Sequence, residues 1–188
     1  MRPLPFAVLA WIMLGLDLGL RDDLRIGPHA VAPSFTFILL VVVASGAPAV
    51  HVAWASLVLG LAFDLASDWT LASGASATII GPNALAFVLA AQLVVAMRAL
   101  VFRKNPVTIA FLALLAGAVA QTLLVGLMTL RAAYDPVQWD ASEQLGERLL
   151  SAVYTALLAL PVSPLLLLAG GLLGFQPHTP RRIRVRGG

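Results

Sequence analysis

Long apolar segments, separated by short polar or proline-containing segments, dominate the chain. Six such segments follow one another, at residues 4–20, 30–47, 48–66, 83–102, 107–130 and 149–175. Most approach the roughly 20 apolar residues that an α-helix needs to cross the hydrocarbon core of a bilayer. The pattern therefore predicts an all-α fold, an integral membrane bundle of about six transmembrane helices.

Proline and glycine mark several breaks between these segments. Residues 46–48 (Gly-Ala-Pro) separate the second and third segments, because proline disfavours helix in the residue before it. Gly81-Pro82 precedes the fourth segment, and residues 103–106 (Arg-Lys-Asn-Pro) precede the fifth. The small residues at 73–77 predict a connection rather than a helix.

The last segment follows the longest expected loop, residues 131–148. Asp140 with Glu143 three residues later has the spacing of a capping box, which indicates a helix start or a short interfacial turn. We expect Pro161 and Pro164 to bend the helix that follows.

Composition supports the membrane interpretation. Hydrophobic residues make up 60% of the 188 positions and charged residues 11%, with a mean hydropathy of +0.94. Soluble domains are about 45–50% apolar and about 25% charged. The chain has no cysteine, which excludes disulfides, thiolate nucleophiles and cysteine metal ligands.

The first segment has an alternative interpretation as a cleaved signal peptide. Its membrane-spanning length and the charge of Asp17 favour a retained helix, as does the lack of a convincing small-x-small cleavage pattern. We therefore expect residues 1–175 to form a single transmembrane helical domain, followed by a basic cytoplasmic tail at 176–188.

Basic residues are distributed unevenly between the two sides of such a bundle. The net charge is +3 and the pI is near 10.2. An excess of basic residues can indicate a nucleic-acid-binding protein, but in so apolar a chain it indicates lysine and arginine in cytoplasmic loops. With six spans, the side that carries the termini holds most of them: Arg2, Arg98, Arg103, Lys104, Arg181, Arg182, Arg184 and Arg186. Arg21, Arg25, Arg131 and Arg148 fall on the opposite side. We expect both termini in the cytoplasm, contact with membrane lipid and no nucleic-acid partner.

Asp64 is the main candidate for a special role. It falls near the end of the third segment, where a carboxylate costs at least a few kcal/mol unless it faces the bundle or a partner. Asp68 shares its face if the helix continues, and paired carboxylates can perform acid–base chemistry. A proton, ion or substrate site is one interpretation. The favoured one is structural, a hydrogen bond to a neighbouring loop.

Other polar residues in the segments have simpler explanations. Asp17 is only a few residues from the charged loop at 21–25, so its side chain can reach the membrane interface. Asn83 and Gln121 can form hydrogen bonds between helices, which contribute about 0.6 kcal/mol on average.

The sequence presents no recognisable catalytic, cofactor-binding or metal-ligating set. His29, His51 and His178 fit no zinc pattern. Ser73 and Ser76 lack the histidine in a later span that an intramembrane serine protease needs. We therefore expect a protein that is not an enzyme and carries no cofactor or metal.

Two stretches resemble the MreD family of bacterial rod-shape-determining proteins. Residues 60–67 (Gly-Leu-Ala-Phe-Asp-Leu-Ala-Ser) are similar to a glycine-rich span that ends in an aspartate-leucine-small-serine run. Residues 81–87 (Gly-Pro-Asn-Ala-Leu-Ala-Phe) are similar to the turn and helix that follow it. Pro33-Ser34-Phe35 resembles the family's proline-aspartate-leucine start of the second span, with serine in place of aspartate.

This resemblance implies a non-enzymatic scaffold subunit of the cell-elongation machinery in the bacterial inner membrane. The implied partners are an MreC-like periplasmic protein, MreB and the peptidoglycan synthase pair. The fold would be similar to substrate-binding subunits of energy-coupling-factor transporters, and a vitamin-binding subunit of such a transporter is the alternative. The candidate structural or partner-binding residues are Asp17, Gly60, Asp64, Asp68, Gly81, Pro82 and Asn83.

Overall fold

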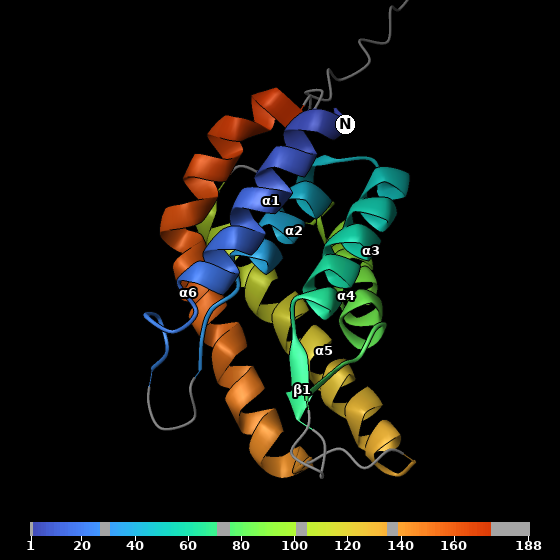
Figure 1. Ribbon diagram of the computed structural model, residues 1–188. Helices are drawn as coiled ribbons and strands as arrows, with labels where there is room; N and C mark the ends of the chain where they lie inside the picture. Colours follow the sequence, from blue (N-terminus) through green and yellow to red (C-terminus); the bar gives the residue numbers. More distant parts are fainter. Residues whose placement is uncertain (1, 27–30, 71–75, 101–104, 135–138, 174–188) are drawn as a thin grey trace, which may run out of the picture.

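A computed structural model describes residues 2–26, 31–70, 76–100, 105–134 and 139–173. In these residues six helices and two short strands follow one another (Figure 1). They are α1 (Pro3–Gly19), α2 (Phe35–Gly46), α3 (Ala49–Leu65), β1 (Asp68–Thr70), β2 (Ser76–Thr78), α4 (Pro82–Met97), α5 (Pro106–Ala132) and α6 (Ala141–Leu173). The prediction of a helical bundle is confirmed, and a small antiparallel hairpin of β1 and β2 is added to it.

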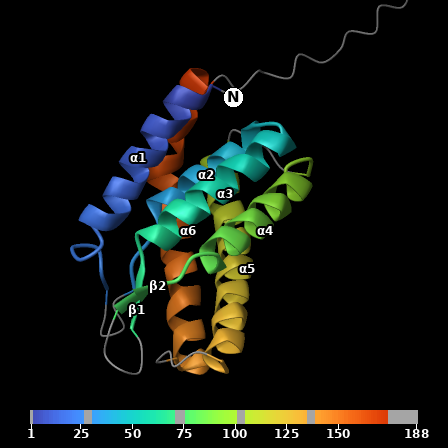
Figure 2. The same cartoon turned by 45° about the vertical axis from the view of Figure 1, so that its right-hand side comes forward.

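Helix α2 forms the centre of the bundle. It contacts each of the other five helices, and all its residues from Phe35 to Ser45 are buried. Its run from Ile38 to Ala44 is almost completely inaccessible to solvent. A helix that is apolar on every side is stable only when it is covered on every side, and the two views of the ribbon show α2 enclosed in this way (Figures 1 and 2).

Helices α5 and α6 pack along one another as the longest pair in the structure (Figure 2). Small residues on α5 make this approach possible. A Cβ atom placed on Gly117 would lie 3.2 Å from the Cβ of Ala152 on α6. The buried positions of α5 include Ala113, Ala116 and Ala120, in agreement with small-residue helix packing.

Helix α2 begins at Phe35, not at residue 30 as the apolar run predicts. Side chains of α6 hold the preceding segment in an extended conformation. The backbone N–H of Ser34 donates to Thr155 Oγ1 at 3.0 Å, and Ser151 Oγ donates to the Ala32 carbonyl at 2.6 Å. Contacts from a distant helix therefore set this boundary.

Helix α6 begins at Ala141, earlier than the apolar run at residue 149 indicates. Asp140 caps it, since its Oδ1 accepts hydrogen bonds from the backbone N–H groups of Ser142 at 3.0 Å and Glu143 at 3.2 Å. The helix contains both Pro161 and Pro164.

Two of the helices are long and apolar enough to cross a membrane. They are α5, from Pro106 to Ala132, and α6 over Ala141–Gly171. The remaining four apolar helices have between 10 and 17 residues, so the described part of the chain contains fewer helices of full bilayer length than the six predicted.

The start of α1 and the end of α6 lie at one end of the bundle, and the β-hairpin lies toward the other (Figure 1). Helix α1 is an integral part of the bundle, since it contacts α2, α3 and α6. The predicted basic tail at 176–188 and the loop residues Arg103 and Lys104 lie outside the described residues.

Candidate functional site

Asp64 joins the end of α3 to the beginning of α4. Its side chain is completely buried. Oδ1 accepts hydrogen bonds from the Asn83 backbone N–H at 3.0 Å and from Asn83 Nδ2 at 2.9 Å. Oδ2 accepts from the backbone N–H groups of Gly81 at 2.8 Å and Ala84 at 3.1 Å. The carboxylate thus caps α4 from a different helix, where the free N–H groups and the positive end of the helix dipole favour a negative charge.

Three neighbouring residues make this junction possible. A Cβ on Gly60 would lie 2.5 Å from the Ala84 Cα, so α3 and α4 approach too closely there for any other residue. Gly81 has φ of +124°, a conformation that L side chains rarely adopt. Pro82 starts the helix, where its missing N–H removes no intrahelical bond. Five of the seven sequence-predicted candidates, Gly60, Asp64, Gly81, Pro82 and Asn83, therefore lie together.

Asp17 makes a second junction of the same kind between α1 and α2. Its oxygens accept hydrogen bonds from Ser34 Oγ at 3.2 Å and from the backbone N–H groups of Phe35 at 2.5 Å and Thr36 at 2.9 Å. The side chain is 7% exposed, so it faces the bundle and does not reach toward the membrane interface as expected. Ser34 also caps α2 itself, because its Oγ accepts from the Phe37 N–H at 3.2 Å.

The same kind of contact joins α1 to α2 and α3 to α4. Asp17 precedes its capped residue Phe35 by 18 positions, and Asp64 precedes Asn83 by 19. In both pairs an aspartate in the last turn of one helix holds the first turn of the next. Since these oxygens accept hydrogen bonds from backbone N–H groups, each aspartate caps the helix that follows it.

Asp68 does not join Asp64. Helix α3 ends at Leu65, so the shared helical face that a paired-carboxylate site requires is not formed. Asp68 instead begins β1, pairs in register with Thr78, and accepts a hydrogen bond from Thr78 Oγ1 at 3.2 Å. Asp68 thus lies in the exposed hairpin, and the continued helix on which the paired-carboxylate interpretation depends is absent.

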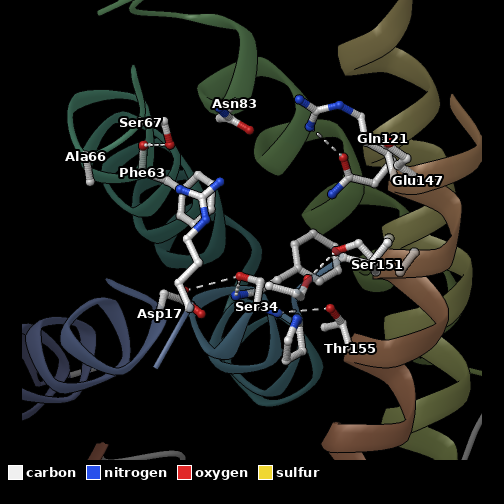
Figure 3. A pocket seen from close by; sticks show the side chains of 18 of the residues that line it. Asp17, Ser34, Phe63, Ala66, Ser67, Asn83, Gln121, Glu147, Ser151 and Thr155 are labelled. Carbon is white, nitrogen blue, oxygen red and sulfur yellow. Dashed lines mark hydrogen bonds between the residues drawn. The ribbon is translucent and has the colours of Figure 1, made fainter. Parts of the chain in front are cut away.

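A pocket of about 310 Å³ lies between the two junctions and the α5–α6 pair (Figure 3). Asp17, Asn83 and Phe63 contribute to it from α1, α4 and α3. The other polar residues that line it are Arg21, Arg25, Ser34, Ser67, Gln121, Gln144, Glu147, Arg148, Ser151 and Thr155. The close view shows labelled side chains from several helices around this space (Figure 3). The pocket therefore gathers polar groups in an otherwise apolar bundle.

Arg148 is the most constrained cation of this pocket. Its Nη1 donates to Gln121 Oε1 at 3.3 Å, which links α6 to α5. Its guanidinium carbon lies 5.3 Å from the centroid of the Trp69 ring and 5.8 Å from that of Trp139. The two indole rings lie 5.8 Å apart, so they form an aromatic support beside the arginine.

Sequence reasoning assigned Gln121 a bond between helices, and the structure contains one. It missed Arg148, which it counted only as a loop charge. The available signal was the Asp140 cap, which extends helix α6 back through Arg148 and so places the charge on a helix rather than in a loop.

The described part of the chain contains no group of three or more histidine, aspartate or glutamate side chains that could hold a metal ion. His51 is exposed on α3. The candidates His29, His178 and Ser73 lie outside the described residues.

Comparisons with family models, curated proteins and solved structures give no match to this chain. The resemblance to the MreD family therefore rests on the residues of the α3–α4 junction and the start of α2.

Proposed function

We propose that this chain is a non-enzymatic scaffold subunit of the bacterial cell-elongation machinery that spans the inner membrane six times. The observation that carries the proposal is the α3–α4 junction. Gly60, Asp64, Gly81, Pro82 and Asn83 carry the resemblance to the MreD family, and they also make one buried, mutually dependent structural unit. Because the residues that resemble the family motif also form one structural unit, they support a fold shared between this chain and that family.

Exposed apolar side chains support the membrane location. Helix α1 exposes Leu4 and Trp11, at 78% and 79%, and Leu168 on α6 is 81% exposed. Further large apolar residues are exposed on the other outer helices, among them Val50, Trp54, Val58, Leu85, Leu89, Val107, Phe111, Leu157 and Leu165. Soluble monomers rarely expose contiguous apolar surface on this scale, whereas lipid tails cover it without cost.

The shorter helices are compatible with a membrane when the bundle is considered as a unit. A helix of 17 residues, such as α1 or α3, is about 25 Å long, a few Å less than the hydrocarbon core of about 30 Å. A bilayer adapts to such a difference by local thinning at modest cost. Helix α2, with 12 residues, is enclosed by protein, so its ends need no lipid contact.

The proposed mechanism is binding. The Asp64 cap fixes the angle and spacing of α3 and α4, which gives a partner helix a rigid surface. An MreC-like periplasmic protein with a single span is the proposed direct partner, and MreB and the peptidoglycan synthase pair are the proposed further components. The termini and the basic loops face the cytoplasm in this arrangement.

Deletion of the gene in a rod-shaped host tests the proposal, with affinity purification from membranes in mild detergent as the biochemical arm. We expect round cells, restored rods on complementation, and co-purification of a single-span periplasmic protein. Normal rods with normal lateral wall insertion in the deletion strain would contradict the proposal.

The polar pocket favours one second candidate, a small-molecule-binding subunit of an energy-coupling-factor transporter. Its volume and mixed lining suit a small ligand. Co-purification of a vitamin, with no effect of deletion on cell shape, would support this candidate over the scaffold.

A further inference from the structure

The pocket contains more cationic than anionic side chains. Arg21, Arg25 and Arg148 line it, together with Asp17 and Glu147. These charges come from α1 and the segment after it and from α6. In a bundle of this hydropathy, a cluster of charged side chains around a cavity indicates a binding function.

Four of the five charges have contacts within the protein, and those of Asp17 and Arg25 hold other parts of the structure. The carboxylate of Asp17 holds the first turn of α2 through Phe35 and Thr36. Arg25 forms an ion pair with Asp22 at 3.1 Å. Arg21, Arg148 and Glu147, which also accepts a hydrogen bond from Gln144 Nε2 at 3.5 Å, line the space with an excess of one positive charge.

The geometry of Arg148 points to an additional partner. Gln121 occupies Nη1 on one edge of the guanidinium, while Nε is buried and has no hydrogen-bond partner among the described residues. A buried donor without an acceptor is energetically unfavourable, because it has lost its hydrogen bonds to water. The nearby tryptophan rings fix the guanidinium in place and offer no acceptor atom for this N–H.

Arg21 and Arg148 both line this pocket, so two positive charges border one space, with the carboxylate of Glu147 beside them. An anion placed between two guanidinium groups would be attracted by both. It would also supply an acceptor for the unpaired Nε. Guanidinium forks bind planar pairs of oxygens in a bidentate manner, and two forks suit the several terminal oxygens of a phosphate group.

We propose that this pocket binds the phosphate group of a small polar ligand or of a lipid head group, with Arg21 and Arg148 as the anion-binding residues. The volume of about 310 Å³ is at the small end of ligand pockets, which fits a compact phosphorylated molecule or one head group. This site goes beyond the scaffold proposal and does not depend on the chain joining a wall-synthesis complex.

Binding can be measured on the purified full-length chain in an uncharged maltoside detergent. One arm titrates glycerol 3-phosphate, with glycerol as its phosphate-free control. The second arm adds phosphatidylglycerol to the micelles, with diacylglycerol as its control. Thermal shift and tryptophan fluorescence are the readouts, because Trp69 and Trp139 both lie against Arg148.

Substitutions of pocket arginines test whether any measured binding takes place in this pocket. Arg21→Gln removes an exposed guanidinium without disturbing the packing, and Arg148→Gln removes the constrained one. We expect each to weaken binding at least tenfold, whereas Arg2→Gln, at the far end of α1, leaves binding unchanged. Saturation only by phosphatidylglycerol would identify a lipid head group as the source of the phosphate. The proposal is overturned if neither probe binds, or if both pocket variants bind as tightly as the wild type.

Discussion

Asp64 and Asn83 are 19 residues apart in the chain, yet one carboxylate oxygen of Asp64 accepts hydrogen bonds from both the backbone N–H and the side-chain amide of Asn83. This contact orders the first turn of α4 and holds it against the end of α3. It also explains how a carboxylate is accommodated in an apolar bundle. Every oxygen of Asp64 has donors, and several of these donors belong to a helix terminus.

Replacement of Asp64 by asparagine should destabilise the protein. The amide group keeps one acceptor oxygen but presents an NH₂ group to backbone donors that now lack an acceptor. We expect a loss of about 1–3 kcal/mol in the free energy of unfolding, measured by denaturant or thermal unfolding in detergent.

Asp68→Asn is the matched control, because Asp68 is exposed in the hairpin. We expect its stability to equal that of the wild type. Normal stability of Asp64→Asn combined with lost complementation of cell shape would instead assign Asp64 a chemical role.

Gly60→Ala tests the close approach of α3 and α4. The added Cβ would meet the backbone of Ala84 at 2.5 Å, so the helices must separate. Overpacking of this kind costs about 1–3 kcal/mol, and we expect a correspondingly lower melting temperature. Gly126→Ala on α5 provides the comparison, since nothing lies within 4 Å of a Cβ there. Equal melting temperatures for the two variants would show that the helices are not in contact at Gly60.

The Asp140 cap predicts a pH-dependent start of α6. Hydrogen bonds from the Ser142 hydroxyl and from the backbone N–H groups of Glu143 and Ser142 lower the pKa of Asp140 below its ordinary value of 3.8. A lowered pKa in the folded state means that the cap stabilises the helix above about pH 3.8 and is lost as the pH falls through the lowered value.

Hydrogen exchange of the Ser142 and Glu143 amides, corrected for intrinsic rates, measures this effect. We expect protection at neutral pH that decreases in strong acid, and Asp140→Ala should be unprotected at both pH values. Equal protection in the variant and the wild type at neutral pH would argue against the cap.

The sequence predicts helices well where the signals are local. Pro82 and Pro106 begin α4 and α5 close to the predicted positions, because Gly81-Pro82 and Asn105-Pro106 are local turn and helix-start signals, and Asn105 also caps α5. The start of α2 is missed because Asp17, Ser151 and Thr155 set it from other helices.

The candidate site also has one part that the sequence predicts and one part that it does not. The α3–α4 junction is accessible to sequence reasoning because all its residues belong to two adjacent segments. The pocket combines side chains from helices far apart in the chain, such as Asp17, Gln121 and Arg148, and no local pattern identifies such a combination. The β-hairpin is also missed, since its strands have three residues each and carry no alternating apolar pattern.

Cysteine accessibility tests the proposed six-span arrangement most directly, because the natural chain contains no cysteine. Single replacements at four exposed positions report the two sides: Arg2→Cys, Leu100→Cys, Asp23→Cys and Ser142→Cys. In intact spheroplasts, an impermeant maleimide should label cysteines at positions 23 and 142, and label those at 2 and 100 only after the membrane is opened. Equal labelling of all four in intact spheroplasts, or recovery of the chain in the soluble fraction, would contradict the account.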